Sequence, residues 1–184
     1  MKLTTALLLN YQPHAILPAG LLDSPGSTTL PLNRYETLID HLSMASPDSD
    51  IHVITETRKI KTRYTVFRKN NLTFHFIRRE PYNLAPFYFF LPGTRRIRSV
   101  LRNIDPDMVV GFGTDDPYGW EAACSGYPFI VCVQGIIQKP SPWLEWSMIR
   151  KQFIKYMEKE TVSNASGIIV ENEFPRHFSS VSPG

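Results

Sequence analysis

The segment from Pro106 to Asn172 constrains the fold of this 184-residue chain more than any other part of it. Two short apolar runs, residues 108–112 and 129–133, each end at a glycine-bearing loop, and a third run covers residues 167–170. A helical pattern separates each run from the next. Strands that alternate with helices predict a parallel sheet covered by helices. Such sheets bind ligands at the carboxyl ends of their strands, so we expect the functional residues at that edge.

The first hundred residues predict further elements of the same kind. Apolar runs predict strands at residues 5–9 and 51–55, and apolar residues at helical spacing predict a helix that ends near Ser43. Residues 62–79 alternate in polarity and are interrupted at Asn70-Asn71. Because asparagine tolerates a positive φ, this dipeptide predicts the turn of a β-hairpin.

Two later helices are predicted with a defined inner face. In the first, residues 94–103, the apolar side chains point inward and the arginines point outward; the arginines are Arg95, Arg96, Arg98 and Arg102. The second is a long helix that opens at Ser141-Pro142, with apolar residues recurring every three or four positions. Each such helix has an apolar stripe to lay against the sheet.

Composition limits the classes of function. The length fits one domain, and a net charge of +3 is too small to indicate nucleic-acid binding. The two cysteines, Cys124 and Cys132, are predicted to be small buried thiols in a reducing, cytoplasmic setting. Histidines and cysteines show no metal-ligand spacing, so we expect neither a metal nor a cofactor. No apolar run approaches the roughly 20 residues that span a bilayer.

Three motifs, in their order and spacing, resemble a known family. They are residues 104–110 (IDPDMVV), residues 125–135 (SGYPFIVCVQG) and residues 164–172 (NASGIIVEN), the last preceded by Glu158 in the long helix. The chain resembles the amino-terminal half of family 4 (group 1) glycosyltransferases. It departs from the family at Gln134, where the family has histidine, at Ser166, where it has aspartate, and at Asn172, where it has serine.

The resemblance implies both a fold and an activity. The fold is an α/β, Rossmann-like three-layer sandwich with a mostly parallel sheet, here as a single amino-terminal domain of the GT-B fold over residues 1–184. Family members transfer a sugar from a nucleotide-sugar donor to an acceptor, with the acceptor held mainly by this domain. The nucleotide-binding domain, with its paired glutamates, is not in this sequence. We therefore expect the acceptor-side half of a retaining glycosyltransferase that is inactive alone.

Candidate site residues follow from the loops at the predicted strand ends. Gly26 and Ser27 open a helix and could offer backbone N–H groups to a phosphate, or form a simple loop and cap. Gly135 allows a ligand to approach the backbone closely. Gln134 is the first catalytic candidate, although it can only orient and hydrogen-bond because it does not titrate. Its alternative is a strand-end side chain satisfied by backbone groups.

Acidic residues supply the remaining candidates. Asp115 and Asp116 follow a strand and precede Pro117, so one of them is expected to cap the next helix. The other can face the cleft, with Asp116 as the second catalytic candidate, a general base, and Asp115 in substrate binding. The family resemblance implies that Glu158 binds substrate. The residues alone instead predict that it belongs to a solvated helix face with neighbouring lysines.

The expected partners are a glycan or glycolipid acceptor and, only with the missing domain, a nucleotide-sugar donor. The arginines of residues 95–102, beside the aromatic residues 87–90, fit peripheral contact with the inner face of a bacterial membrane, or an exposed basic helix. The setting would be polysaccharide biosynthesis. The rival hypothesis, from another class, is a non-catalytic Rossmann-like module that binds a partner protein or glycan.

Overall fold

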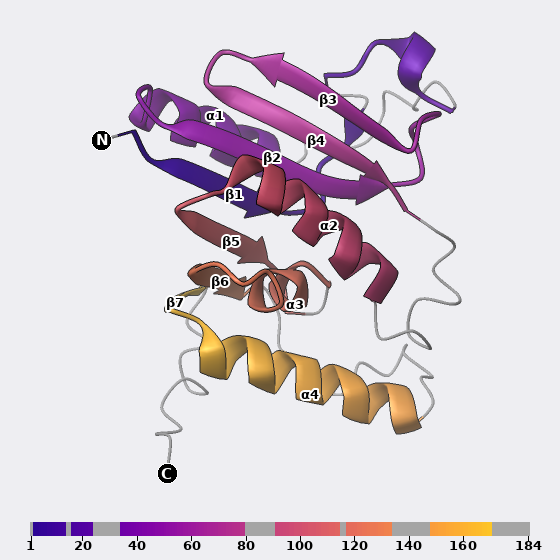
Figure 1. Cartoon of the computed structure of the whole chain (residues 1–184), viewed down its shortest axis with the longest axis vertical. Coiled ribbons are helices and arrows are strands. Elements are labelled where there is room, and N and C mark those ends of the chain that lie inside the picture. The colour runs from indigo at the N-terminus through magenta and orange to yellow at the C-terminus, as the bar shows by residue number, and fades with distance from the viewer. Residues whose placement is uncertain are drawn as a thin grey trace.

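The computed structural model places one seven-stranded sheet between helices on both faces (Figure 1). It describes residues 2–13, 16–23, 34–79, 91–114, 117–133 and 148–170. The strands are β1 (Thr4–Leu8), β2 (Asp50–Thr57), β3 (Tyr64–Lys69), β4 (Leu72–Arg78), β5 (Met108–Phe112), β6 (Phe129–Val133) and β7 (Gly167–Val170). The helices are α1 (Arg34–Ala45), α2 (Leu91–Ile104), α3 (Pro117–Ala123) and α4 (Met148–Asn164), with a 3-10 turn at Ala19–Leu21.

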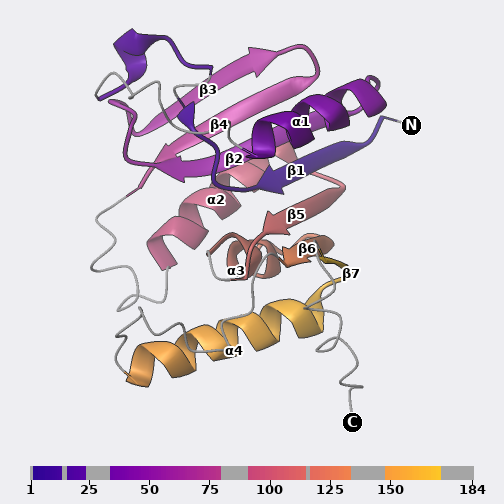
Figure 2. The same ribbon diagram turned by 180° about the vertical axis from the view of Figure 1, so that it is seen from behind.

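The sheet is parallel except at one edge. Its strand order is β3-β4-β2-β1-β5-β6-β7. Only β3 runs antiparallel, because it enters through the predicted hairpin to β4, while the other neighbouring pairs are parallel. The carboxyl ends of the parallel strands therefore share one edge (Figure 2). The mostly parallel α/β sheet predicted from the sequence is confirmed.

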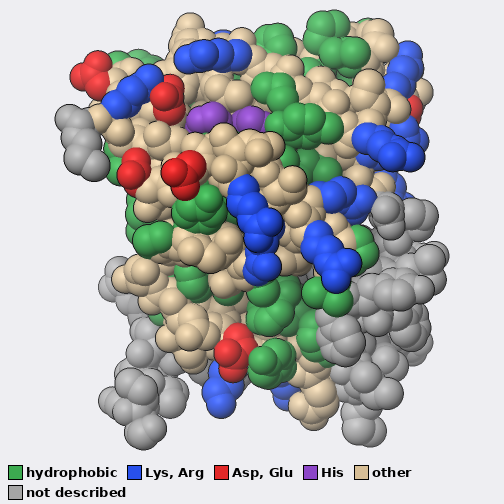
Figure 3. Space-filling model, in the orientation of Figure 1, with side chains coloured by type: hydrophobic (Ala, Val, Ile, Leu, Met, Phe, Trp, Pro, Cys, Tyr) green, Lys and Arg blue, Asp and Glu red, His purple; other side chains and the backbone are tan. Residues whose placement is uncertain are grey.

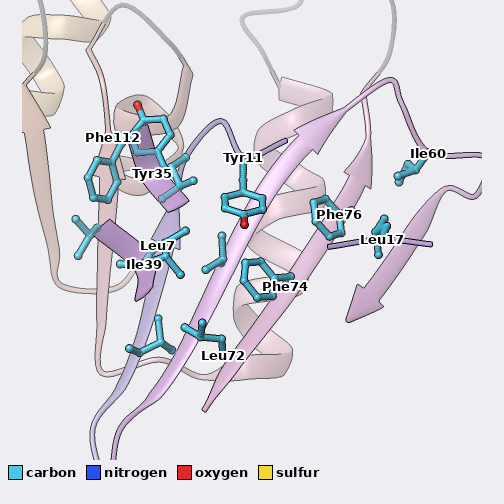
Figure 4. Close-up of a cluster of buried hydrophobic side chains, with 14 of the residues drawn as sticks. Leu7, Tyr11, Leu17, Tyr35, Ile39, Ile60, Leu72, Phe74, Phe76 and Phe112 are labelled. Atoms are coloured by element: carbon cyan, nitrogen blue, oxygen red, sulfur yellow. The ribbon is translucent and has the colours of Figure 1, made fainter. Parts of the chain in front are cut away.

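The face covered by α1 holds most of the buried aromatic side chains among the described residues. Tyr35 and Ile39 from α1 pack against Leu7 of β1 and against Phe112 of β5 (Figure 4). Tyr35 and Phe112 meet edge to face, with ring centroids 5.6 Å apart. Strand β4 contributes further aromatic residues to this face. The ring centroid of Tyr11, which follows β1, lies 5.2 Å from that of Phe74. Helix α1 is amphipathic for this reason: one stripe of it closes the core.

The opposite face is covered by α2 and α3. Ile97 and Leu101 of α2 are fully buried against Leu8 and Ile54, as the helical periodicity predicted. Helix α3 sits directly on β5, because Gly111 of that strand has no side chain to hold the helix away. A Cβ at Gly111 would lie 2.8 Å from the carbonyl oxygen of Tyr118 and 2.9 Å from the Cβ of Ala122.

The hairpin turn and its anchor involve two consecutive asparagines. Asn70 has a φ of 56°, in the left-handed region that asparagine tolerates, so the predicted hairpin is confirmed. Asn71 then reaches across to the end of α1. Its Nδ2 donates to the carbonyl oxygens of Ser43, Ser46 and Ser49 at 3.4, 3.0 and 3.3 Å. One amide thus links the hairpin turn before β4 to the last turn of α1 and to the loop that follows it.

The prediction that all four arginines of α2 point outward is half wrong. Arg95 and Arg102 are exposed, but Arg96 and Arg98 are partly buried. Arg96 pairs with Glu56, and Arg98 donates to the carbonyl oxygen of Cys124. Of the two cysteines, Cys132 is buried as predicted, whereas Cys124 is only partly so. Helical spacing identifies the apolar stripe, but it does not show which polar partners draw the arginines beside that stripe into partly buried positions.

Candidate functional site

A pocket of about 300 Å³ opens at the carboxyl edge of the sheet. Its lining comes from the last residues of β2 and from the segments that follow β1, β2 and β4, and these strands are neighbours in the strand order. The lining residues are Asn10, Gln12, Glu56, Thr57, Arg58, Lys59 and Arg79. This is the edge at which parallel α/β sheets bind their ligands.

Short hydrogen bonds hold the walls of the pocket together. Lys59 donates from Nζ to Gln12 Oε1 at 2.7 Å, which joins the segment after β2 to the segment after β1. The backbone N–H of Lys59 donates to Thr57 Oγ1 at 3.2 Å, and the N–H of Arg79 donates to the carbonyl oxygen of Thr57 at 2.8 Å. The three walls are therefore fixed relative to one another by interactions among the described residues.

Glu56 is the buried acidic residue in the lining of this pocket. Its side chain is 5% exposed, and its carboxylate lies 3.7 Å from Arg79 Nε and 3.5 Å from Arg96 Nη2. A buried carboxylate needs such partners, because desolvation penalises an isolated charge by several kcal/mol. Glu56 thus fixes two guanidinium groups that come from different parts of the chain.

A second buried carboxylate converges on the same place. Glu121 of α3 is 1% exposed. A Cβ built on Gly93, in the first turn of α2, would lie 3.0 Å from Glu56 Oε1 and 3.1 Å from Glu121 Oε1. The glycine therefore leaves room for two acidic side chains beside the start of α2. A larger residue at position 93 would displace one of them.

Tyr118 of α3 forms a hydrogen bond with the backbone of Glu56. Its hydroxyl oxygen accepts the backbone N–H of Glu56 at 3.2 Å and lies 3.3 Å from Thr55 Oγ1. Thr55 Oγ1 in turn accepts the N–H of Tyr11 at 3.1 Å. Burial raises the pKa of the Tyr118 hydroxyl above its ordinary value, so it stays protonated and acts as a fixed hydrogen-bonding group.

Glu158 is the one site residue predicted from the sequence that the structure describes. It is 5% exposed on α4, and Thr114, directly after β5, donates to its Oε1 at 3.4 Å. The alternative of a solvated helix face is wrong for this residue, because α4 turns it toward the sheet edge. Its part in substrate binding stays a prediction. The other predicted site residues, Gly26, Ser27, Asp115, Asp116, Gln134 and Gly135, lie outside the described residues.

A separate polar cluster lies nearer the amino end of β2. His52 Nδ1 and His75 Nε2 are 2.9 Å apart, and Tyr64 Oη lies 2.6 Å from His75 Nδ1. Burial lowers the pKa of His52, and burial together with the His52 charge lowers that of His75 to about 4. Histidines are visible on this face in Figure 3. Within the described part of the chain, groups of three or more His, Cys, Asp or Glu residues suited to a metal ion are absent.

Sequence reasoning missed the pocket residues. The available signals were the polar run Glu56–Lys59 at the end of one apolar segment and the arginine pair Arg78-Arg79 at the end of the next parallel strand. Because these strands are neighbours only in space, the sequence did not show that their ends meet.

No family model and no curated protein matches this chain. Solved structures match its fold. The sucrose-phosphate synthase from Thermosynechococcus elongatus aligns with a TM-score of 0.59 and 12% identity over 97% of this chain and 46% of that chain. An E. coli trehalose-6-phosphate synthase, bound with UDP-2-fluoro glucose, aligns with a TM-score of 0.55 and 11% identity over 95% and 41%.

The UDP-GlcNAc 2-epimerase from Methanocaldococcus jannaschii aligns with a TM-score of 0.51 and 14% identity over 95% of this chain and 41% of that chain. The fold is that of a Rossmann-like domain of the GT-B type. The chain spans less than half the length of each of these proteins. Among the described helices, none is long and apolar enough to cross a membrane.

Proposed function

We propose that this chain is the acceptor-side half of a GT-B glycosyltransferase, which moves a sugar from a nucleotide-sugar donor to a glycan or glycolipid acceptor. The observation that carries the proposal is the pocket at the carboxyl ends of β1, β2 and β4. It combines hydrogen-bonding groups, Asn10, Gln12 and Thr57, with charged side chains, and such a lining suits a hydroxylated ligand. The fold alone does not decide the chemistry, since an epimerase shares it.

The neighbours support the kind of ligand. Two of the three act on, or are bound with, a UDP-sugar by name, and the third is named for a phosphorylated sugar. We propose that donor chemistry requires the second domain of the complete protein. In that setting Gln134 and Asp116 take the catalytic positions, and Gly26, Ser27, Asp115, Gly135 and Glu158 contact substrate. The burial of Glu158 beside Thr114, at the same edge of the sheet, is consistent with this role.

Two measurements on the purified chain test this proposal. In the first, amide NMR follows the addition of neutral mono- and oligosaccharides, and we expect shifts at Asn10, Thr57 and Lys59. In the second, nucleotide release from UDP-glucose and GDP-mannose is measured, and we expect none from this chain alone. Turnover of donor by this chain would contradict the proposal. Saccharide shifts spread over other surfaces, with the pocket amides unmoved, would favour the non-catalytic binding module instead.

A further inference from the structure

The pocket has more positive than negative charge. Arg58, Lys59 and Arg79 line it, and Glu56 is its one acidic lining residue. Glu56 is already shared with Arg96, which lies outside the lining. Figure 3 shows Lys and Arg side chains gathered over α2 and the carboxyl ends of β2 and β4. When Arg96 and the buried Glu121 beside Glu56 are counted as well, four cationic side chains meet two carboxylates, so the local field at this edge favours an anion.

The cationic groups are also held in place. Arg79 is fixed by its pairing with Glu56 and by its backbone bond to Thr57. Lys59 is fixed through Gln12. Groups that are ordered before binding lose less conformational entropy when a ligand arrives. A solvated surface charge would lack these attachments.

We propose that this pocket recognises a phosphate group, with Arg58, Lys59 and Arg79 as its cationic ligands. A phosphate monoester carries about −1.5 to −2 charges near neutral pH. A ligand with this charge complements the cationic lining better than a ligand with a single carboxylate would. Arginine forks bind phosphate oxygens in pairs, and lysine adds a point charge. Asn10 and Gln12 then hydrogen-bond the attached sugar. That last assignment rests on the proposed function; the phosphate site itself does not.

The same phosphate could belong to a soluble sugar phosphate or to a lipid phosphate. Its chemistry is shared, so the experiment separates the sources. Calorimetry and amide NMR follow the addition of inorganic phosphate and of glucose 6-phosphate. Flotation with vesicles of phosphatidylcholine, with and without phosphatidic acid, tests the lipid arm. We expect phosphate to shift the amides of Arg58, Lys59 and Arg79, and one arm to bind more tightly than inorganic phosphate.

Charge-removing variants locate the site. Arg58→Gln and Lys59→Gln should each weaken phosphate binding at least about tenfold, as expected for the loss of a charge-assisted hydrogen bond. Arg102→Gln makes the same change in charge at the far end of α2 and should leave binding unchanged. Arg79→Lys keeps the charge but loses the paired N–H donors, so it should also weaken phosphate binding, and unchanged binding would remove Arg79 from the site.

The following outcomes decide whether the phosphate site and the proposed function each hold. Equal binding by wild type and both pocket variants, or equal weakening by Arg102→Gln, would overturn the phosphate site. So would the absence of phosphate shifts at millimolar concentration. Neutral saccharides binding in the pocket without phosphate would preserve the acceptor-side function and remove this inference. Phosphate binding without any saccharide binding would preserve the anion site and remove the acceptor role.

Discussion

Replacing Gly111 by alanine tests how closely α3 is packed on the sheet. The new methyl carbon would lie 2.8 Å from the Tyr118 carbonyl oxygen, 2.9 Å from Ala122 Cβ and 3.0 Å from Gly119 Cα. Ordinary contacts begin near 3.4 Å, and two of these three atoms belong to the main chain of α3. Rotamer changes therefore cannot relieve the overlap. Strand β5 lies between β1 and β6, so the helix must move instead.

Two opposing contributions determine the change in the free energy of unfolding caused by Gly111→Ala. Overpacking costs typically about 1–3 kcal/mol, and three simultaneous close contacts put this site at the upper end. Replacing glycine by alanine returns about 0.4–1 kcal/mol by restricting the unfolded chain. The net loss is about 2 kcal/mol, which lowers the melting temperature by roughly 4–8 °C for a domain of this size.

Thermal unfolding followed by circular dichroism measures the effect. Gly20→Ala is the matched control, because a Cβ there has no atom within 4 Å. It should leave the melting temperature within about 2 °C of wild type, since a surface change of this kind is usually worth less than 0.5 kcal/mol. A Gly111→Ala variant as stable as Gly20→Ala would refute the close packing of α3 on β5.

Three further predictions concern polar anchors. Asn71→Ala removes the amide that caps the carbonyl groups after α1 and should cost about 1–3 kcal/mol in urea unfolding; an unchanged midpoint would count against that anchor. Tyr118→Phe leaves the Glu56 N–H without the hydroxyl and should cost about 1–2 kcal/mol, and normal stability would show that another acceptor suffices. Stability should fall as the pH falls from about 6.5 to 4, because His75 takes up its proton readily only when unfolded. His75→Asn should flatten that part of the profile, with the neighbouring His52, Tyr64 and Arg68 unchanged; an identical profile would contradict the assignment.

Much of the fold was predictable because its signals are local. The strand at residues 108–112 is an apolar run ended by a glycine, and the structure gives it the same bounds. The hairpin was predicted from the dipeptide Asn70-Asn71 alone, because asparagine tolerates a positive φ whatever surrounds it. The strand at 51–55 was correctly placed but extends to Thr57. Its last two residues, Glu56 and Thr57, are polar and buried, so apolar patterning ended too soon.

The candidate site was less predictable because it depends on contacts between distant segments. Glu56 is buried only because Arg79 and Arg96 reach it from two other elements. Glu158 has lysines beside it in sequence, which suggested a solvated face, yet its own side chain turns toward Thr114. The sequence shows where the charged side chains are, but tertiary packing determines which of them are buried.

Because one carboxylate holds both Arg79 and Arg96, the pocket and helix α2 are mechanically joined. An incoming anion that competes for Arg79 would weaken its pairing with Glu56 and leave Arg96 as a partner of that carboxylate. Because coupling between two sites is reciprocal, a change that strengthened the Arg96–Glu56 pair would alter anion binding in the pocket by the same free energy.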